Sequence, residues 1–316
     1  MVKEEINNEM AMSLNHVKQK LFRQRYEIGF LPYDEKIVVS GKKIKPRFIK
    51  NPPKDKWYAD PFLLEVTDKN FVVLVEEFRY GKIGRIAKLE VDRKSMNIVS
   101  EVILLDLPTH LSFPIFYRDG EDIYIYPENC ASGSLSLYKY IRILNVFTYV
   151  KTLVDRPLTD AVVFHVVRLS GGGYYLLATD CRKEDGSNDE MLIFHSDRID
   201  GDYEQVQIVN FDRKIARNAG VIVNIKGVSY RVAQDCTKSY GYSMIFQKIK
   251  NDEQNMFSFE NVSQILPRSL WYGTHTFNVC GDWAVVDVNV AVYPLIRRLY
   301  FGLASYFKMI FRKLGL

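Results

Sequence analysis

The chain has 316 residues, of which 47% are hydrophobic and 13% aromatic, so it can bury a large core and is not a disordered protein. The net charge of +5 resides in the last 23 residues, because the rest of the chain holds 38 basic and 38 acidic residues. This neutral body argues against nucleic acid as a partner, since nucleic-acid-binding domains usually carry a basic face.

The chain is predicted to begin with a helix and to continue as strands. Residues 1–22 form the N-terminal unit, with apolar residues at helical spacing over 4–22. This unit lacks the apolar core of a signal peptide. From residue 23 onward, Gly, Asp and Asn turns separate short apolar runs such as ADPFLLEV, NFVVLVEEF and GRIAKLEV. This pattern is typical of an all-β fold.

Two series of positions recur together along residues 23–292. In one series an apolar strand ends with an acid, and the spacings are 51, 52, 55 and 52 residues: Glu77, Glu128, Asp180, Asp235 and Asp287. In the other series a strand begins upstream of each acid, and the spacings are 53, 47, 58 and 57 residues: Asp60, Phe113, Asp160, Asn218 and His275. Five units of this size fit four-stranded blades, so we predict a five-bladed β-propeller over 23–292.

The fifth unit has room for only two strands before the tail. We expect its outer strands to come from residues 24–50, including the segments RYEIGF and KIVVS. Such a closure would join the two ends of the ring and leave no free sheet edge.

Residues 293–316 are predicted to form a basic amphipathic helix. Pro294 suits a helix start, and basic side chains gather roughly opposite large apolar ones. This pattern is typical of a helix that lies in a membrane surface, and a helix packed on the propeller or in a dimer is the alternative. We expect a cytoplasmic protein that is peripheral on the inner face of the membrane. No stretch of 18 apolar residues predicts a membrane span.

The four cysteines, Cys130, Cys181, Cys236 and Cys280, form no CxxC pair. A zinc site or a redox motif is therefore not indicated. We expect free thiols in a reducing compartment.

Both recurring series should lie at one end of the ring, because the first strand of a blade begins where the antiparallel second strand ends. This mouth is the expected site, since loops and strand ends commonly bind ligands. Paired carboxylates suit glycosyl chemistry, in which one acts as base or nucleophile and the other donates a proton. The expected catalytic residues are Asp60, Asp160 and Glu128. The expected substrate-binding residues are Glu77, His110, Arg217, Asn218, Asp235, Lys238 and His275, and Glu76 is the alternative to Glu77.

Arg217 and Lys238 would suit an anionic group on the sugar. A structural interpretation competes for the recurring acids, which could simply cap turns by accepting backbone N–H bonds. It is favoured for Asp180, Asp235 and Asp287, because catalysis does not need five copies. Asp60 and Asp160 differ, since the other three units have no acid at that position.

Several motifs resemble the propeller domain of glucosamine inositolphosphorylceramide transferases and their bacterial relatives. They are WYADPF, VEEF, HLSFPIF with YPEN, DAVVF with LLATD, RNAGVI with YRVAQDCTKSYG, and GTHTFN with VVD. The resemblance covers roughly residues 24–290, and YRVAQDCTKSYG is its most specific part. It implies a carbohydrate-active protein that transfers or cleaves glycosyl groups in surface polysaccharide or glycolipid assembly. The partner would be a sugar or a lipid-linked glycan.

That domain is in turn similar to furanosidase-like propellers, including family 43 glycoside hydrolases. The similarity implies that Asp60 is the general base, that Asp160 tunes the acid, and that His275 lies near a central water or metal. A divalent metal in the central channel is therefore kept open, and no other cofactor is expected. The general acid of that group is a Glu in the fourth blade, where this chain has Arg217 and Asn218.

This departure supports two alternatives to an enzyme. One is a non-catalytic sugar-binding or scaffold module of a polysaccharide biosynthesis complex. The other is a propeller that binds proteins of an assembly complex.

Overall fold

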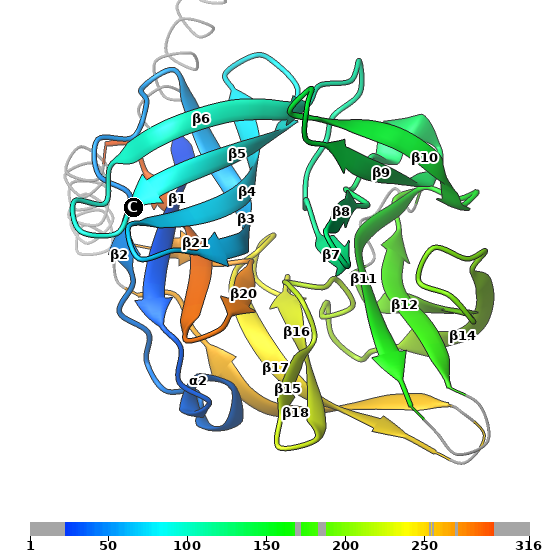
Figure 1. The fold of residues 1–316 in the computed structure, drawn as a ribbon. Helices are drawn as coiled ribbons and strands as arrows, with labels where there is room; N and C mark the ends of the chain where they lie inside the picture. The colour runs from blue at the N-terminus through cyan, green and yellow to red at the C-terminus, as the bar shows by residue number, and fades with distance from the viewer. Residues whose placement is uncertain are drawn as a thin grey trace, which may run out of the picture.

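Five antiparallel sheets stand in a ring in the computed structural model, each with its first strand toward the centre (Figure 1). The predicted all-β five-bladed propeller is thereby confirmed. The predicted helices within 1–22 and 293–316 fall outside the described part of the chain, apart from Tyr293. The structure describes residues 23–167, 172–182, 188–252, 254, 256–268 and 271–293.

Blades 1 to 4 each consist of four consecutive strands. Blade 1 contains β3 (Lys56–Val66), β4 (Asn70–Arg79), β5 (Arg85–Asp92) and β6 (Ile98–Leu105). Blade 2 contains β7 (Phe116–Asp119), β8 (Asp122–Ile125), the 3-10 turn η1 (Cys130–Ser132), β9 (Leu135–Ile141) and β10 (Val146–Val154). Blade 3 contains β11 (Leu158–Val166), β12 (Gly173–Asp180), β13 (Glu190–Ser196) and β14 (Glu204–Asn210). Blade 4 contains β15 (Val223–Ile225), β16 (Val228–Asp235), β17 (Ser243–Asn251) and β18 (Phe257–Ile265).

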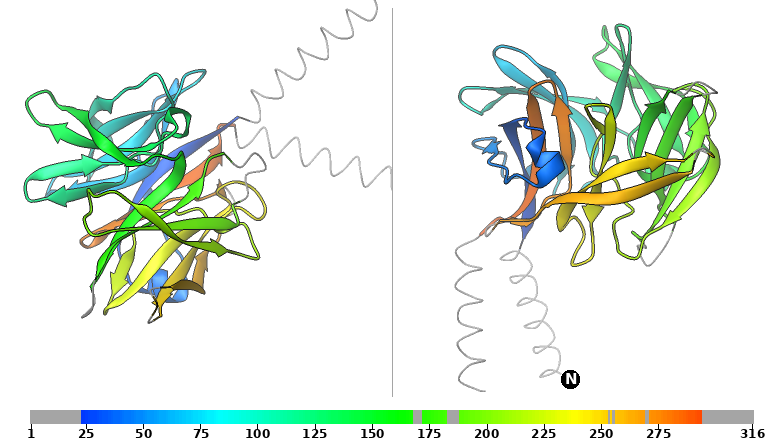
Figure 2. Two further views of the ribbon diagram at one scale, coloured as in Figure 1. Left: turned by 90° about the vertical axis from the view of Figure 1, so that its right-hand side faces the viewer. Right: turned by 90° about the horizontal axis from the view of Figure 1, so that it is seen from below.

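Blade 5 is built from both ends of the described chain. It contains β19 (Trp271–Gly273), β20 (Phe277–Cys280), β21 (Trp283–Ala291), β1 (Gln24–Pro32) and β2 (Arg47–Phe48). β1 pairs with β21 over its whole length, from Gln24 opposite Ala291 to Pro32 opposite Trp283. The expected closure by RYEIGF is therefore confirmed. Figure 2 shows the first and last described strands side by side, with their outer ends on one side of the ring.

The expectation that KIVVS forms a strand is wrong, because these residues form the helix α2 (Lys36–Ser40). The short strand β2 pairs with Gly29 and Phe30 on the outer edge of β1, where a strand at KIVVS would have had to pair. Its backbone bonds locally instead, as in the bond from the Val39 N–H to the Glu35 carbonyl. The helix buries Ile37 and Val38 and packs against β18.

The core lies between the blades, and this explains why β4 reads FVVLV without polar gaps. Successive side chains of a strand point to opposite faces, and both faces are covered by neighbouring blades. Phe71, Val73 and Val75 pack with Ile28 and Phe30 of blade 5. Leu74 packs on the other face, in the cluster shared with blade 2. The same alternation decides the directions of the two glutamates that follow.

The innermost strands are irregular close to the mouth. The register of β3 on β4 shifts after Ala59, and that of β11 on β12 shifts after Thr159. The residues that follow, Asp60 and Asp160, both have a φ of 48°, which is uncommon for residues other than glycine. In blade 5, residues 274–276 separate β19 from β20. Such bulges redirect side chains, and here they turn Asp60, Asp160 and His275 away from their own ladders.

Candidate functional site

Seven charged or titratable side chains from all five blades meet at the mouth, where the inner strands begin. We call this group the acidic mouth. Blade 1 supplies two carboxyl groups, blades 2 and 3 one each, blade 4 an arginine, and blade 5 a histidine and a carboxylate. The members are Asp60, Glu76, Glu128, Asp160, Arg217, His275 and Asp287.

His275 joins Asp60 to Asp287. Its Nδ1 lies 2.8 Å from Asp287 Oδ1, and its Nε2 lies 3.4 Å from Asp60 Oδ1. The Asp60 N–H donates to Asp287 Oδ2 at 3.0 Å, and the Phe113 N–H donates to Asp60 Oδ2 at 3.1 Å. All three side chains are buried, and the ring of Tyr26 from β1 stacks on His275 at 4.5 Å. The Asp60 carboxylate is therefore held by blades 2 and 5.

The two carboxylates favour a charged imidazole. Burial alone would lower the pKa of His275, but Asp287, Tyr26 and Asp60 raise it well above its ordinary value. Burial raises the pKa of Asp60 to about 6, with Asp287 and Glu128 adding to the effect and His275 opposing it. Ligand atoms of Asp60, His275 and Asp287 lie within 4.8 Å of one another, as at a metal site. As arranged, however, both ring nitrogens contact carboxylates, so the protonated ring has no lone pair for a cation. The arrangement fits an imidazolium better than a metal, and the metal expected in the central channel stays a prediction.

Arg217 holds the second pair of carboxylates. Its Nε donates to Asp160 Oδ2 at 2.6 Å, and its Nη2 lies 3.5 Å from Glu128 Oε2. Nη2 also donates to Thr159 Oγ1 at 2.7 Å, and that hydroxyl bonds Glu128. Burial raises the pKa of Asp160 to about 7, although Arg217 opposes the shift. Nε and Nη2 of Arg217 thus contact groups of the protein itself. The expected partner of Arg217 was an anionic group on the sugar.

Tyr240 links the two halves of the acidic mouth. Its ring centre lies 5.0 Å from Arg217 Cζ and 5.6 Å from the ring of His275. The side chain is half exposed, so one part of the ring stays open to a ligand. An aromatic face beside carboxylates suits the apolar face of a sugar, because the ring packs against C–H groups while the acids bind hydroxyls.

Asn218 is a buried support of this arrangement. Its Nδ2 donates to the Asp160 and Leu177 carbonyls at 2.7 and 2.9 Å. Its Oδ1 accepts from the Nε of Arg231 at 2.6 Å, and Arg231 is fully buried. Gln234 adds a bond from its Nε2 to Asp160 Oδ2 at 3.1 Å. Asn218, expected to bind substrate, therefore touches the backbone of Asp160.

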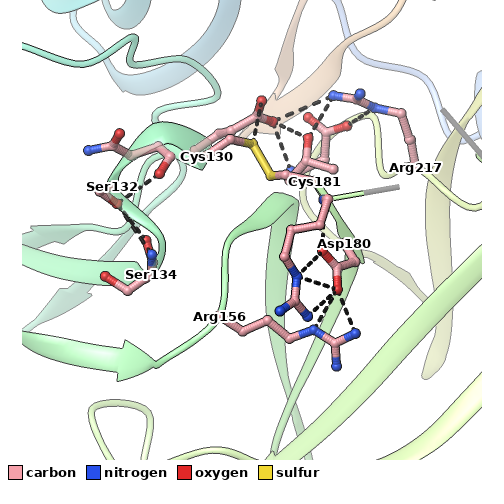
Figure 3. The surroundings of a disulfide bond; sticks show 12 residues. Cys130, Ser132, Ser134, Arg156, Asp180, Cys181 and Arg217 are labelled. Atoms are coloured by element: carbon pink, nitrogen blue, oxygen red, sulfur yellow. Dashed lines mark hydrogen bonds and ion pairs between the residues drawn. A yellow bond between two sulfur atoms is a disulfide. The ribbon is translucent and has the colours of Figure 1, made fainter. Parts of the chain in front are cut away.

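A disulfide bond between Cys130 and Cys181 lies beside Arg217 and the carboxylates that Arg217 contacts (Figure 3). The Cys130 sulfur lies 3.7 Å from Glu128 Oε1. The expectation of free thiols is therefore wrong for this pair and confirmed for Cys236 and Cys280. The physical reason is the repeat. The two residues are 51 positions apart, which is one blade, so they follow the second strands of adjacent blades and meet.

Three expected substrate-binding residues lie apart from the acidic mouth. Glu77 is fully buried and contacts Arg79 Nε at 2.8 Å and Arg85 Nη2 at 2.9 Å. Asp235 bonds Arg213 at 2.7 Å and accepts the Thr237 N–H at 3.0 Å. Glu77 and Asp235 thus bind groups of the protein itself, as expected if the recurring acids have a structural role.

Lys238 is exposed, and its Nζ donates to the hydroxyl of Tyr242 at 3.1 Å. His110, in contrast, lies at the edge of the mouth, where its Nε2 is 3.3 Å from Glu76 Oε1.

Reasoning from the sequence missed parts of the site. The expectation chose Glu77 over its alternative Glu76, but strand alternation directs Glu76 to the mouth together with Leu74, and this signal was available in the motif VEEF. Asp287 was interpreted as a turn cap, and it does accept the backbone N–H groups of His275 and Thr276; what the interpretation missed is its contact with the His275 ring. Tyr26 was not considered, since nothing in the local sequence of β1 indicates that it reaches the last blade's histidine.

Comparisons with known proteins agree with this architecture. The family described as glucosamine inositolphosphorylceramide transferase 1, N-terminal, matches residues 49–278. The curated protein "Glucosamine inositolphosphorylceramide transferase 1" of Arabidopsis thaliana is 29% identical over 197 residues, which are 61% of this chain and 25% of that protein. Its namesake in Oryza sativa subsp. japonica is 31% identical over 153 residues, which are 47% of this chain and 20% of that protein. The match spans about a quarter or less of these relatives.

Solved structures share the fold. An exo-β-1,3-galactanase from Phanerochaete chrysosporium superposes with a TM-score of 0.51 at 10% identity, over 84% of this chain and 63% of that one. A family 43 glycoside hydrolase from Xanthomonas citri superposes with a TM-score of 0.50 at 11% identity, over 76% and 89%. At such identities the likeness shows the fold alone. Because the family match covers more than half of the sequence, the chain belongs to the family of the N-terminal domain of glucosamine inositolphosphorylceramide transferase 1.

Proposed function

We propose that this protein is a carbohydrate-active enzyme that transfers or cleaves a glycosyl group at the acidic mouth, in the assembly of a glycolipid or surface polysaccharide. The observation that carries the proposal is the presence of two separately held carboxylate pairs around one half-exposed tyrosine. Asp60 and Asp287 flank His275, Asp160 and Glu128 flank Arg217, and Tyr240 contacts both cations. The family and the shared fold support the same class of chemistry.

Asp60 is placed to act as the base in this proposal. One of its oxygens accepts a backbone N–H and the other faces His275, so the carboxylate is oriented before substrate binds. A hydroxyl of water or of an acceptor would lose its proton to Asp60 as it attacks the sugar. The positive charge of His275 favours the ionised form of Asp60. Asp160 and Glu128, neutralised by Arg217, would then hold the sugar hydroxyls.

A lipid-linked substrate fits the position of the chain ends. The Val292 N–H donates to the Arg23 carbonyl at 2.9 Å, beside the end of β21. Asp287 of the acidic mouth lies on the same strand, and the basic residues of 294–316 come next in the sequence. The described part of the chain contains no helix with the length and hydrophobicity of a membrane span. We propose that the basic tail binds an anionic membrane surface and brings the mouth near lipid-linked sugars.

A second candidate is a sugar-binding module without catalysis. The observation that favours it is Arg217, which stands where the wider propeller group has its acid and which neutralises two mouth carboxylates. Such a site would bind sugar hydroxyls, and Arg217 would keep Asp160 and Glu128 from protonating a leaving group.

Turnover measurements separate the two candidates. Purified protein is incubated with nucleotide sugars and lipid-linked sugars, and product is followed by mass spectrometry, with binding measured in parallel by calorimetry. An enzyme loses turnover in Asp60→Asn and retains binding. A binding module shows heat of binding and no product from any donor or acceptor, and that result would overturn the enzymatic proposal.

A further inference from the structure

Glu76 occupies a singular position in the acidic mouth. It follows Leu74 on the blade 2 side of β4, and its side chain is only 11% exposed. Its strongest electrostatic neighbours are Asp60, His275 and Glu128, which come from three blades. Burial and the nearby carboxylates raise its pKa well above the ordinary value.

The other four carboxylates of the mouth each contact a cation. Arg217 contacts Glu128 and Asp160, and His275 contacts Asp60 and Asp287. Glu76 instead faces His110, whose pKa is lowered by burial. An uncharged partner gives no Coulombic compensation for ionising Glu76.

A backbone N–H selects the tautomer of His110. The Gly84 N–H donates to His110 Nδ1 at 2.9 Å, so Nδ1 is the acceptor and the ring proton resides on Nε2. Nε2 lies 3.3 Å from Glu76 Oε1. Oε1 is therefore the oxygen that lies next to this N–H group, which leaves Oε2 as the oxygen that carries the proton of this carboxyl.

Only glycine fits at position 84, because the surrounding atoms leave no space for a Cβ. A Cβ at this position would lie 2.5 Å from the Leu111 carbonyl oxygen, 2.7 Å from Glu76 Oε1 and 2.8 Å from His110 Cε1. All three distances are shorter than real contacts of a Cβ. The Leu111 N–H also donates to the Gly84 carbonyl at 3.0 Å. Gly84, His110 and Glu76 thus form one closely packed unit between blades 1 and 2.

We propose that Glu76 is the proton donor of the acidic mouth, with His110 and Gly84 as its positioning residues. The inference rests on the proposed function and supplies the acid that the fourth blade lacks. In the reaction, the bond between the anomeric carbon and the leaving oxygen breaks as Oε2 gives its proton to that oxygen. The attacking hydroxyl gives its own proton to Asp60. A proton then returns from Asp60 to Glu76 through solvent, and both residues are restored.

The first test measures the proton itself and needs no substrate. Asp160, with a pKa of about 7, also contributes a protonated carboxyl at pH 7, so the infrared spectra of the wild type and of Glu76→Gln are compared by difference. Glu76→Gln should remove one component of the carbonyl stretch of protonated carboxyls. In His110→Phe the titration midpoint of this component should shift, whereas a merely structural histidine would leave it in place. Glu121→Gln, at a 94% exposed side chain, is the matched control and should leave this component unchanged. If Glu76→Gln keeps every protonated-carboxyl component of the wild type, the proposal is overturned.

The second test uses leaving groups. Synthetic glycosides with alkyl and nitrophenyl leaving groups serve as probes, because only a poor leaving group needs its proton from an acid. Glu76→Gln should lower kcat at least about 100-fold for alkyl glycosides and far less for nitrophenyl glycosides. Equal losses for both would show that Glu76 is not the donor. If neither the wild type nor any variant turns over a probe while the infrared band behaves as expected, the proposed enzymatic function fails and the proton-bearing carboxyl stands.

Discussion

Removing the Cys130–Cys181 disulfide should destabilise the protein by about 4 kcal/mol. The bond closes a loop of 51 residues, and the entropy of loop closure in the unfolded chain predicts roughly this value. In a domain of this size each kcal/mol corresponds to about 2–4 °C, so Tm should fall by about 8–16 °C. The double variant Cys130→Ser/Cys181→Ser is compared with the wild type by scanning calorimetry without reductant.

Two controls separate the bond from the loss of sulfur. The wild type with reductant should melt like the double variant, and reductant should leave the double variant unchanged. Alkylation in denaturant without reductant should label Cys236 and Cys280 and no other cysteine. Four labelled cysteines in protein purified under oxidising conditions, or a Tm difference below about 2 °C, would refute the reasoning. The same count bears on localisation, since disulfides are rare in the cytosol and a cytoplasmic location is still a prediction.

Three further predictions concern the mouth and the closure of the ring. Arg217→Ala should cost about 3–5 kcal/mol in urea denaturation, because it leaves the buried Asp160 and the half-buried Glu128 without their cation; Arg142→Ala, which removes the exposed pair with Glu121, should cost about 1 kcal/mol or less, and equal costs would contradict the burial argument. Stability should fall as pH rises through about 6 to 7, because the raised pKa values of Asp60 and Asp160 make the folded state bind more protons than the unfolded one above pH 4; Tm measured at pH 5 and 8 tests this, and Asp160→Asn should flatten the slope. Phe30→Ala on β1 should cost about 3–5 kcal/mol, since its fully buried ring stacks on Phe71 at 4.3 Å; a cost near that of Val206→Ala, at an exposed position of β14, would mean that β1 does not close the ring.

The fold was predictable because two series of positions in the sequence repeat with the same period. Strand starts and strand ends advance together, and each period matches one blade, so the five-bladed ring and its closure by β1 follow from spacing alone. KIVVS was misinterpreted because its β-branched residues favour strands, while the pairing of β1 with β2 decided the outcome. A local pattern does not show which sheet edge remains free.

For the site, the sequence predicted which residues lie near one another and not which of them are in contact. The spacing predicted which strand ends meet, and it brought Asp60, Asp160, Glu128 and His275 to one mouth. It did not predict which side chains pair across blades, since the bond of Arg217 to Asp160 depends on the bulge in β11 that turns Asp160. The choice between Glu76 and Glu77 depends on a single position along β4, because adjacent side chains point to opposite faces.

The closure of blade 5 also has a consequence for synthesis on the ribosome. β1 precedes the four complete blades in the chain, whereas its partner β21 follows them. Until β21 has been made, the only native strand beside β1 among the described residues is the two-residue strand β2, so the edge that pairs with β21 and the apolar residues of β1 are exposed. Blades 1 to 4 can form as consecutive hairpins in the order of synthesis, whereas the ring closes only after β21 has been made. A nascent chain that stalls before β21 would therefore leave β1 as its most aggregation-prone strand.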